Sequence, residues 1–161
     1  MPRATTGFEK ITADVAVTPT CDDAGMVRSV RALREKLGEL VAEFDPRLVD
    51  ARTARDLVEE FGAIERMAAA ARTLAAGRVA TTRVWADEGD RSAAHWLART
   101  TGTTVGDAVA TLETARHLDG FEATEAAFRA GDLSLAQAGA ITKAAAADPH
   151  AEGDLLAVAT T

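Results

Sequence analysis

The fold of this chain is decided by residues 91–149, which read RSAAHWLARTTGTTVGDAVATLETARHLDGFEATEAAFRAGDLSLAQAGAITKAAAADP. Alanine-rich segments alternate here with glycine-containing breaks at Thr101–Gly102, Asp119–Gly120 and Gly131. Alanine has the highest helix propensity, whereas glycine commonly follows the last residue of a helix. The stretch therefore predicts several short helices that end at these glycines.

Hydroxyl residues stand where three of these helices would begin. Ser92, Thr103 or Thr104, and Ser134 can each cap the free N–H groups of a following helix, and Asp148–Pro149 ends the last of the three. The predicted helices cover about residues 92–101, 104–118, 122–129, 134–147 and 154–159.

The N-terminal half predicts two long helices. Over residues 24–44 the apolar side chains recur three or four residues apart, as on one face of a helix, and Asp45–Pro46 ends it. A second apolar pattern runs from roughly Pro46 to Trp85, where Gly62 or Gly77 could kink or break the helix. Two long amphipathic helices with a short connection predict an antiparallel helical hairpin.

The predicted organisation is all-α. Residues 1–23 lack a sustained pattern and are expected to form a mobile tail. Residues 24–88 would form the hairpin, and the polar break at 87–90 precedes a subdomain of short helices over 89–161. We expect the last two segments to form one continuous domain. The chain ends without a cap or polar tail, so we expect it to be a fragment of a longer protein.

Composition narrows the classes of protein. The N-terminus shows no signal peptide and no uncharged run is long enough for a membrane span. The single cysteine, Cys21, rules out an internal disulfide and favours a reducing cytoplasm. The net charge is −7, and residues 88–161 hold 5 Lys and Arg against 11 Asp and Glu. Such an acidic segment is a poor generic binder of polyanions, because phosphate neutralisation dominates non-specific DNA binding.

Sites for chemistry are not evident in the sequence. His95, His117 and His150 are isolated from one another, and neither HExxH, CxxC, a P-loop nor GxGxxG occurs. We expect these histidines to be structural and Cys21 to be a spare thiol. The sequence predicts no catalytic residue, metal, cofactor or small-molecule ligand.

A helix-turn-helix corner is one interpretation of residues 92–118. Ala98, Gly102 and Ala108 stand at the offsets where such a motif needs a small residue, a turn glycine and an apolar residue. The second helix would present outward Thr103, Thr104, Asp107, Thr111 and Arg116. The alternative is a corner used only for packing.

A second candidate surface lies over Gly131–Ala145. Ser134, Gln137 and Lys143 could face a nucleic acid from the helix that Ser134 caps. The alternative is an ordinary capped surface helix.

Taken together, several segments resemble the domain of unknown function 222 family. The resemblance covers about residues 91–149 and is carried by His95–Ala98, Thr101–Gly102, Asp107–Leu118, Ala127–Ser134, Ala136–Gln137, Ile141 and Asp148–Pro149. It implies a helical domain of the kind that precedes a C-terminal HNH endonuclease domain in actinobacterial repeat proteins. Family members often have Leu-Pro where this chain has Leu118-Asp119-Gly120.

The resemblance carries over no catalytic residue. An HNH site needs metal-binding histidines and an asparagine on a ββα element, and this sequence contains no asparagine. The leading hypothesis is therefore a non-catalytic accessory domain that assists DNA recognition. The expected nucleic-acid contacts are Arg91, Arg99, Thr103, Thr104, Arg116, Gln137 and Lys143. The alternatives are a protein-interaction or oligomerisation module, with a nuclease domain or a second copy as partner, and the remnant of a truncated nuclease gene.

Overall fold

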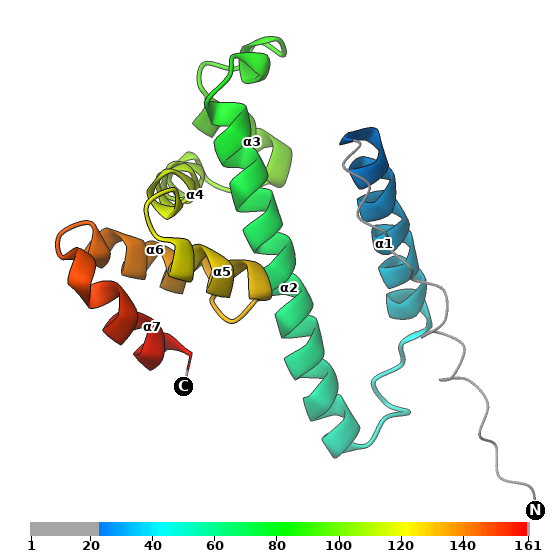
Figure 1. Cartoon of the computed structure of the whole chain (residues 1–161). Coiled ribbons are helices and arrows are strands. Elements are labelled where there is room, and N and C mark those ends of the chain that lie inside the picture. Colours follow the sequence, from blue (N-terminus) through cyan, green and yellow to red (C-terminus); the bar gives the residue numbers. More distant parts are fainter. Residues whose placement is uncertain (1–22, 161) are drawn as a thin grey trace, which may run out of the picture. The chain divides into compact units, whose positions relative to one another are not determined.

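The computed structural model describes residues 23–160, and every regular element among them is a helix (Figure 1). The all-α prediction is confirmed. The chain divides into two units, Met1–Asp50 and Ala51–Thr161, and each is described by itself. The predicted tail and Cys21 lie outside the described residues, apart from Asp23, which begins the first helix.

Among its described residues, 23–50, the first unit contains one long helix, α1 (Asp23–Glu43). Its end is fixed by the turn that follows, in which the Asp45 carboxylate accepts hydrogen bonds from the Arg47 backbone N–H at 3.0 Å and from Arg47 Nη2 at 2.7 Å. The side-chain hydrogen bond from Arg47 also holds the pKa of Asp45 below its usual value. The predicted stop at Asp45–Pro46 is thus confirmed.

The second unit is organised along α2 (Ala51–Ala80), a helix that continues without a break through Gly62 and Gly77. A break at either glycine is therefore not observed. Gly77 has a packing role, because a Cβ built on it would lie only 2.9 Å from Ala115 Cβ. The short 3-10 helix η1 (Val84–Ala86) follows, so the long pattern that was predicted to reach Trp85 comprises two elements.

Five shorter helices follow, close to where the sequence predicts them. Their bounds are α3 (Ala93–Thr101), α4 (Val105–Leu118), α5 (Glu122–Ala130), α6 (Leu135–Ala145) and, after the 3-10 helix η2 (Pro149–Ala151), α7 (Glu152–Ala159). Ser92, Thr104 and Ser134 cap α3, α4 and α6 through their side chains. Gly102 and Gly131 end α3 and α5 with φ of 70° and 81°, a region that glycine enters without steric cost.

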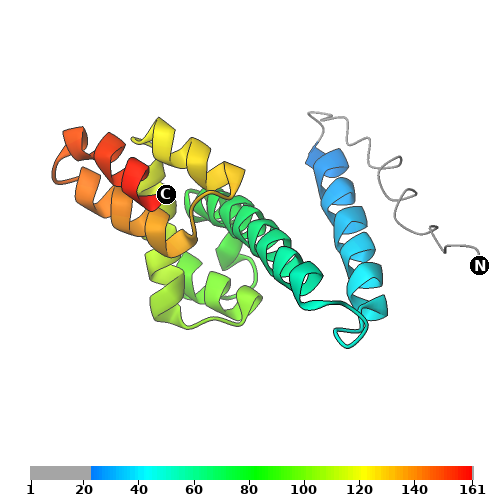
Figure 2. The same ribbon diagram turned by 90° about the horizontal axis from the view of Figure 1, so that it is seen from below.

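The core of this unit lies where the short helices gather beside the second half of α2 (Figures 1 and 2). Phe128, Leu118 and Leu133 are its largest fully buried apolar side chains, and Ile141 joins them. A second cluster surrounds Leu97 on α3 and consists mainly of alanines. Small side chains let these helices approach closely, and a few large residues fill the space between them.

Side-chain hydrogen bonds connect separate helices at two places. Glu152, the first residue of α7, accepts hydrogen bonds from Thr124 N at 3.0 Å and from Thr124 Oγ1 at 2.8 Å. It thereby caps α5, whose own N-cap residue Phe121 makes no side-chain cap. Arg66 of α2 donates to the carbonyl oxygen of Gly131 just after α5.

The orientation of Thr111 differs from its prediction. Thr111 was expected to point outward from the second helix of the corner, but it is buried and donates a hydrogen bond to the Asp107 carbonyl oxygen at 2.8 Å. The reason is that α4 contacts α6 as well as α2 and α3, so the side of α4 that carries Thr111 is covered.

The two units test only part of the predicted domain organisation. The proposed boundary at 88–89 falls inside the second unit, whose helix α2 contacts α3, α4, α5 and α6. The antiparallel hairpin over residues 24–88 spans both units and stays a prediction.

Candidate functional site

Arg99, one of the predicted DNA contacts, is already engaged by carboxylates. Its Nη2 lies 2.7 Å from Asp90 Oδ2 and also forms an ion pair with Glu88. The hydrogen bond that Arg99 donates to Asp90 is the main cause of a raised Arg99 pKa, and the same bond holds the pKa of Asp90 below its usual value. A phosphate would have to displace two carboxylates to bind this guanidinium.

Thr103 and Thr104 are exposed in the connection between α3 and α4, where they also serve the local structure. Thr104 Oγ1 accepts from Asp107 N at 3.1 Å and donates to Asp107 Oδ2 at 2.7 Å. Thr103 Oγ1 lies 3.0 Å from Thr101 Oγ1. The two hydroxyls therefore stabilise the corner, and Asp107 places a negative charge beside it.

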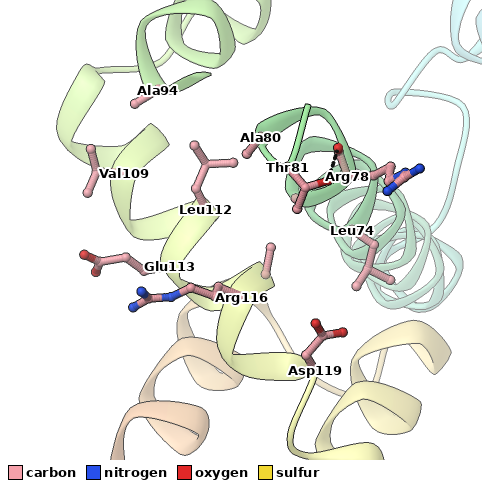
Figure 3. A pocket seen from close by; sticks show the side chains of 12 residues that line it. Leu74, Arg78, Ala80, Thr81, Ala94, Val109, Leu112, Glu113, Arg116 and Asp119 are labelled. Carbon is pink, nitrogen blue, oxygen red and sulfur yellow. Dashed lines mark hydrogen bonds between the residues drawn. The ribbon is translucent and has the colours of Figure 1, made fainter. Parts of the chain in front are cut away.

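Arg116 borders an open cleft of about 650 Å³ between α2, α3 and α4. The floor is apolar, and Leu112 projects from α4 toward Ala80 of α2 (Figure 3). Glu113 and Arg116 point away from α2 at the edge of the cleft, so one acid accompanies the base. This arrangement offers apolar contact area with a charge-balanced rim.

Gln137 and Lys143 lie on α6, away from the α3–α4 corner in sequence. Gln137 completes a capping box with Ser134, and its Nε2 donates to the Ala159 carbonyl oxygen at 3.2 Å. Lys143 lines a second cleft of about 580 Å³ between α4 and α6, together with Asp107 and Glu113.

The seven predicted contacts thus divide among several places. Arg91 is exposed just before α3, Arg99 is held by acids, and Arg116 and Lys143 border different clefts. Arg116 and Lys143 each line a cleft that carboxylates also line. The structure does not bring the four bases together around a single cleft.

The histidines and carboxylates of the second unit form no metal-binding group. Within residues 23–160 there is no cluster of three or more His, Cys, Asp or Glu side chains with the spacing to hold an ion. His95 illustrates the structural alternative, because its Nδ1 lies 2.8 Å from Oγ of the α3 cap Ser92. No helix in the same range combines the length and the apolar run that a membrane span requires.

The most conspicuous surface is the apolar face of α1. Its large side chains are exposed, with 60% of Leu33, 62% of Val30 and 66% of Met26 accessible to solvent. Together with Leu37, Leu40 and Phe44, these residues follow one another at alternating spacings of four and three. We call this set of six the α1 seam: Met26, Val30, Leu33, Leu37, Leu40 and Phe44.

The spacing of the α1 seam is that of the a and d positions of a heptad repeat, in which a row of apolar side chains faces another helix. The apolar pattern over residues 24–44 indicated this face in the sequence, where it was assigned to the hairpin. The strict alternation of four and three was readable from the residue numbers and is the signal that would have identified the seam.

The first half of α2 also carries exposed apolar side chains. This half extends beyond the cluster of short helices (Figure 1), and the fully buried residues of α2 all lie in its second half, at Ala70, Thr73 and Ala76. Val58 and Ile64 are among its exposed apolar side chains.

Comparison with known proteins assigns no relative to this arrangement. No family model matches the chain, and no curated protein or solved structure matches it either. The surfaces described above are therefore the features that indicate the function of this chain.

Proposed function

We propose that this chain is a non-catalytic helical module that associates with another polypeptide through the α1 seam. The observation that carries this proposal is a row of six apolar side chains in a heptad pattern, of which five are exposed and Leu37 is half-buried. Scattered apolar residues on a surface are ordinary, whereas a contiguous apolar row is typical of a protein-binding surface. The charge of the chain supports the proposal, because an acidic protein is better suited to a protein partner than to DNA.

Accessibility of the seam to a hydrophobic dye tests this function. At about 0.1 μM full-length chain, where weak complexes dissociate, Leu33→Glu should lower the fluorescence of a bound apolar dye. Leu48→Glu is the matched control, because Leu48 lies outside the seam and is 84% exposed. An identical signal from wild type and Leu33→Glu, with the α1 amides protected from exchange at the same dilution, would mean that the chain covers its own seam and would refute the proposal.

DNA recognition at the α3–α4 corner is the second candidate. It is favoured by the exposed Thr103 and Thr104 beside Gly102 and by the resemblance to the family that accompanies HNH endonucleases. In this proposal the chain would be an accessory domain in the cytoplasm. Fluorescence anisotropy with duplex DNA at about 50 mM salt tests it, since electrostatic binding strengthens as salt falls. Binding that Arg91→Ala and Arg116→Ala weaken would support DNA recognition, and the absence of binding would refute it.

A further inference from the structure

The charges of α1 indicate which polypeptide covers its seam. This helix carries four acids and four bases, in contrast to the acidic segment 88–161. The acids are Asp23, Glu35, Glu39 and Glu43, and the bases are Arg28, Arg31, Arg34 and Lys36. A surface without net charge can meet a copy of itself without the like-charge repulsion that the rest of this chain would impose.

From the heptad spacing and this charge balance, we propose that the α1 seam pairs with the α1 seam of a second copy of this chain. This inference rests on the proposed association function and names its partner. A heptad row is self-complementary, because each a or d side chain fits between side chains of the facing helix.

The size of the seam indicates a reversible dimer. A helix of 21 residues is about 31 Å long at 1.5 Å per residue. Only the seam and the positions that flank it would face a partner, and these are fewer residues than one side of a standard interface, which has roughly 20–30 contact residues. We therefore expect dissociation on the order of micromolar concentration.

The order of charges along α1 favours an antiparallel pair. From Asp23 to Arg34 the helix carries one acid and three bases, and from Glu35 to Glu43 it carries three acids and one base. Antiparallel pairing places the basic half of one copy beside the acidic half of the other and opposes the two helix dipoles.

The centre of such a pair lies near Glu35, where the bases of the two copies come closest. Arg34 and Lys36 alternate there with Glu35 and Glu39, and Lys36 Nζ lies 3.4 Å from Glu39 Oε2 in the same helix. The local charge of the centre is therefore balanced. Met26 of one copy falls opposite Phe44 of the other, so the largest side chain of the seam meets a flexible one.

Light scattering of the full-length chain over about 1–500 μM tests the pairing. We expect wild type to pass from monomer to dimer and Leu33→Glu to raise the dissociation constant at least tenfold. Two controls add the same charge elsewhere: Leu48→Glu, outside the helix, and Ala32→Glu, at an exposed position of α1 away from the seam. Both should dimerise as wild type does. Circular dichroism shows whether each variant remains helical.

A monomer at every concentration overturns the self-pairing. The dye measurement then tests whether the seam associates with a different polypeptide. If the dye binds the monomer through Leu33, the association function stands with a different partner. If the seam is covered within the monomer, both proposals fail. Dimers that Leu33→Glu leaves unchanged also overturn the pairing, because they form elsewhere.

Cys21 reports the orientation, since it precedes α1 by only two residues. In a parallel pair the two thiols would lie at one end and oxidise readily to a disulfide-linked dimer. In the antiparallel pair they are separated by about 31 Å of helix, against a reach of roughly 7 Å for two extended residues at each end. Rapid, complete cross-linking of the wild-type dimer by a mild oxidant would overturn the antiparallel arrangement and leave the self-pairing intact.

Discussion

Replacing Thr73 by valine should stabilise the second unit. Thr73 lies on α2 with 0% of its surface exposed, and among the described residues its hydroxyl is the one buried side-chain polar atom without a hydrogen-bond partner. A buried hydroxyl that lacks a partner costs about 1–3 kcal/mol of desolvation. Valine has the same shape and a similar helix propensity, so the substitution removes this cost without opening a cavity. We expect a gain of about 1–2 kcal/mol in the free energy of unfolding.

Thr142→Val is the matched control. Thr142 is also 0% exposed, but its hydroxyl donates to the Ala138 carbonyl oxygen at 2.9 Å. Here valine removes a hydrogen bond whose net contribution is about 1 kcal/mol, and we expect a loss of that order. The two variants exchange the same atoms in equally buried positions, so the difference in sign isolates the hydrogen bond.

Urea unfolding followed by circular dichroism measures both effects. The transition midpoints should move in opposite directions while the slope with urea stays constant, since neither variant changes the surface exposed on unfolding. The melting temperatures should differ accordingly, by about 4 °C per kcal/mol for a unit of this size. If Thr73→Val lowers the midpoint as Thr142→Val does, the reasoning about the unpaired hydroxyl is refuted.

Substitutions at four further positions, Gly77, Gly38, Glu152 and Arg99, test other features of the fold. Gly77→Ala should lower the melting temperature of the second unit, because the added Cβ would lie 2.9 Å from Ala115 Cβ. Gly38→Ala is the contrasting case, because a Cβ there has no atom within 4 Å. It should raise the helical signal of α1 by improving helix propensity. Glu152→Ala should cost about 1 kcal/mol in urea unfolding by removing the cap of α5, and Glu152→Gln, which keeps an acceptor oxygen, should cost less; equal costs would exclude the capping role. Arg99→Gln should raise the pKa of Asp90 in a carboxyl NMR titration, because Arg99 holds that pKa low. The stability that this interaction contributes is present above the usual aspartate pKa and is lost as pH falls through the lowered one, so Arg99→Gln should flatten the acid limb of the stability profile.

The helix ends were predictable because their signals are local. Ser92 and Ser134 cap helices through bonds to residues three positions away, and Gly102 and Gly131 adopt positive φ after the last turn. Such geometry depends on a few neighbouring residues, which the sequence displays directly. The cap of α5 by Glu152 could not be found in this way, because the two partners are 28 residues apart.

Burial on α4 was harder to predict, because threonine is polar yet can satisfy its hydroxyl within its own helix. Thr111 and Thr114 each donate to the carbonyl oxygen four residues earlier and are buried among neighbouring helices. An apolar periodicity counts neither residue as core. Thr111 was therefore expected to point outward.

The predicted contacts around the α3–α4 corner show the same limit for function. A sequence displays an arginine such as Arg99, but its availability depends on which carboxylates the fold places beside it, and here Glu88 and Asp90 occupy it. The apolar face of α1 presents the opposite case. Its pattern is complete in the sequence, and what the structure adds is that Met26, Val30 and Leu33 are exposed. Burying such side chains is worth about 1.5–3 kcal/mol each, whereas an exposed ion pair contributes at most about 1 kcal/mol. The larger free energy available at α1 is the reason to seek the partner of this protein there before seeking DNA at the corner.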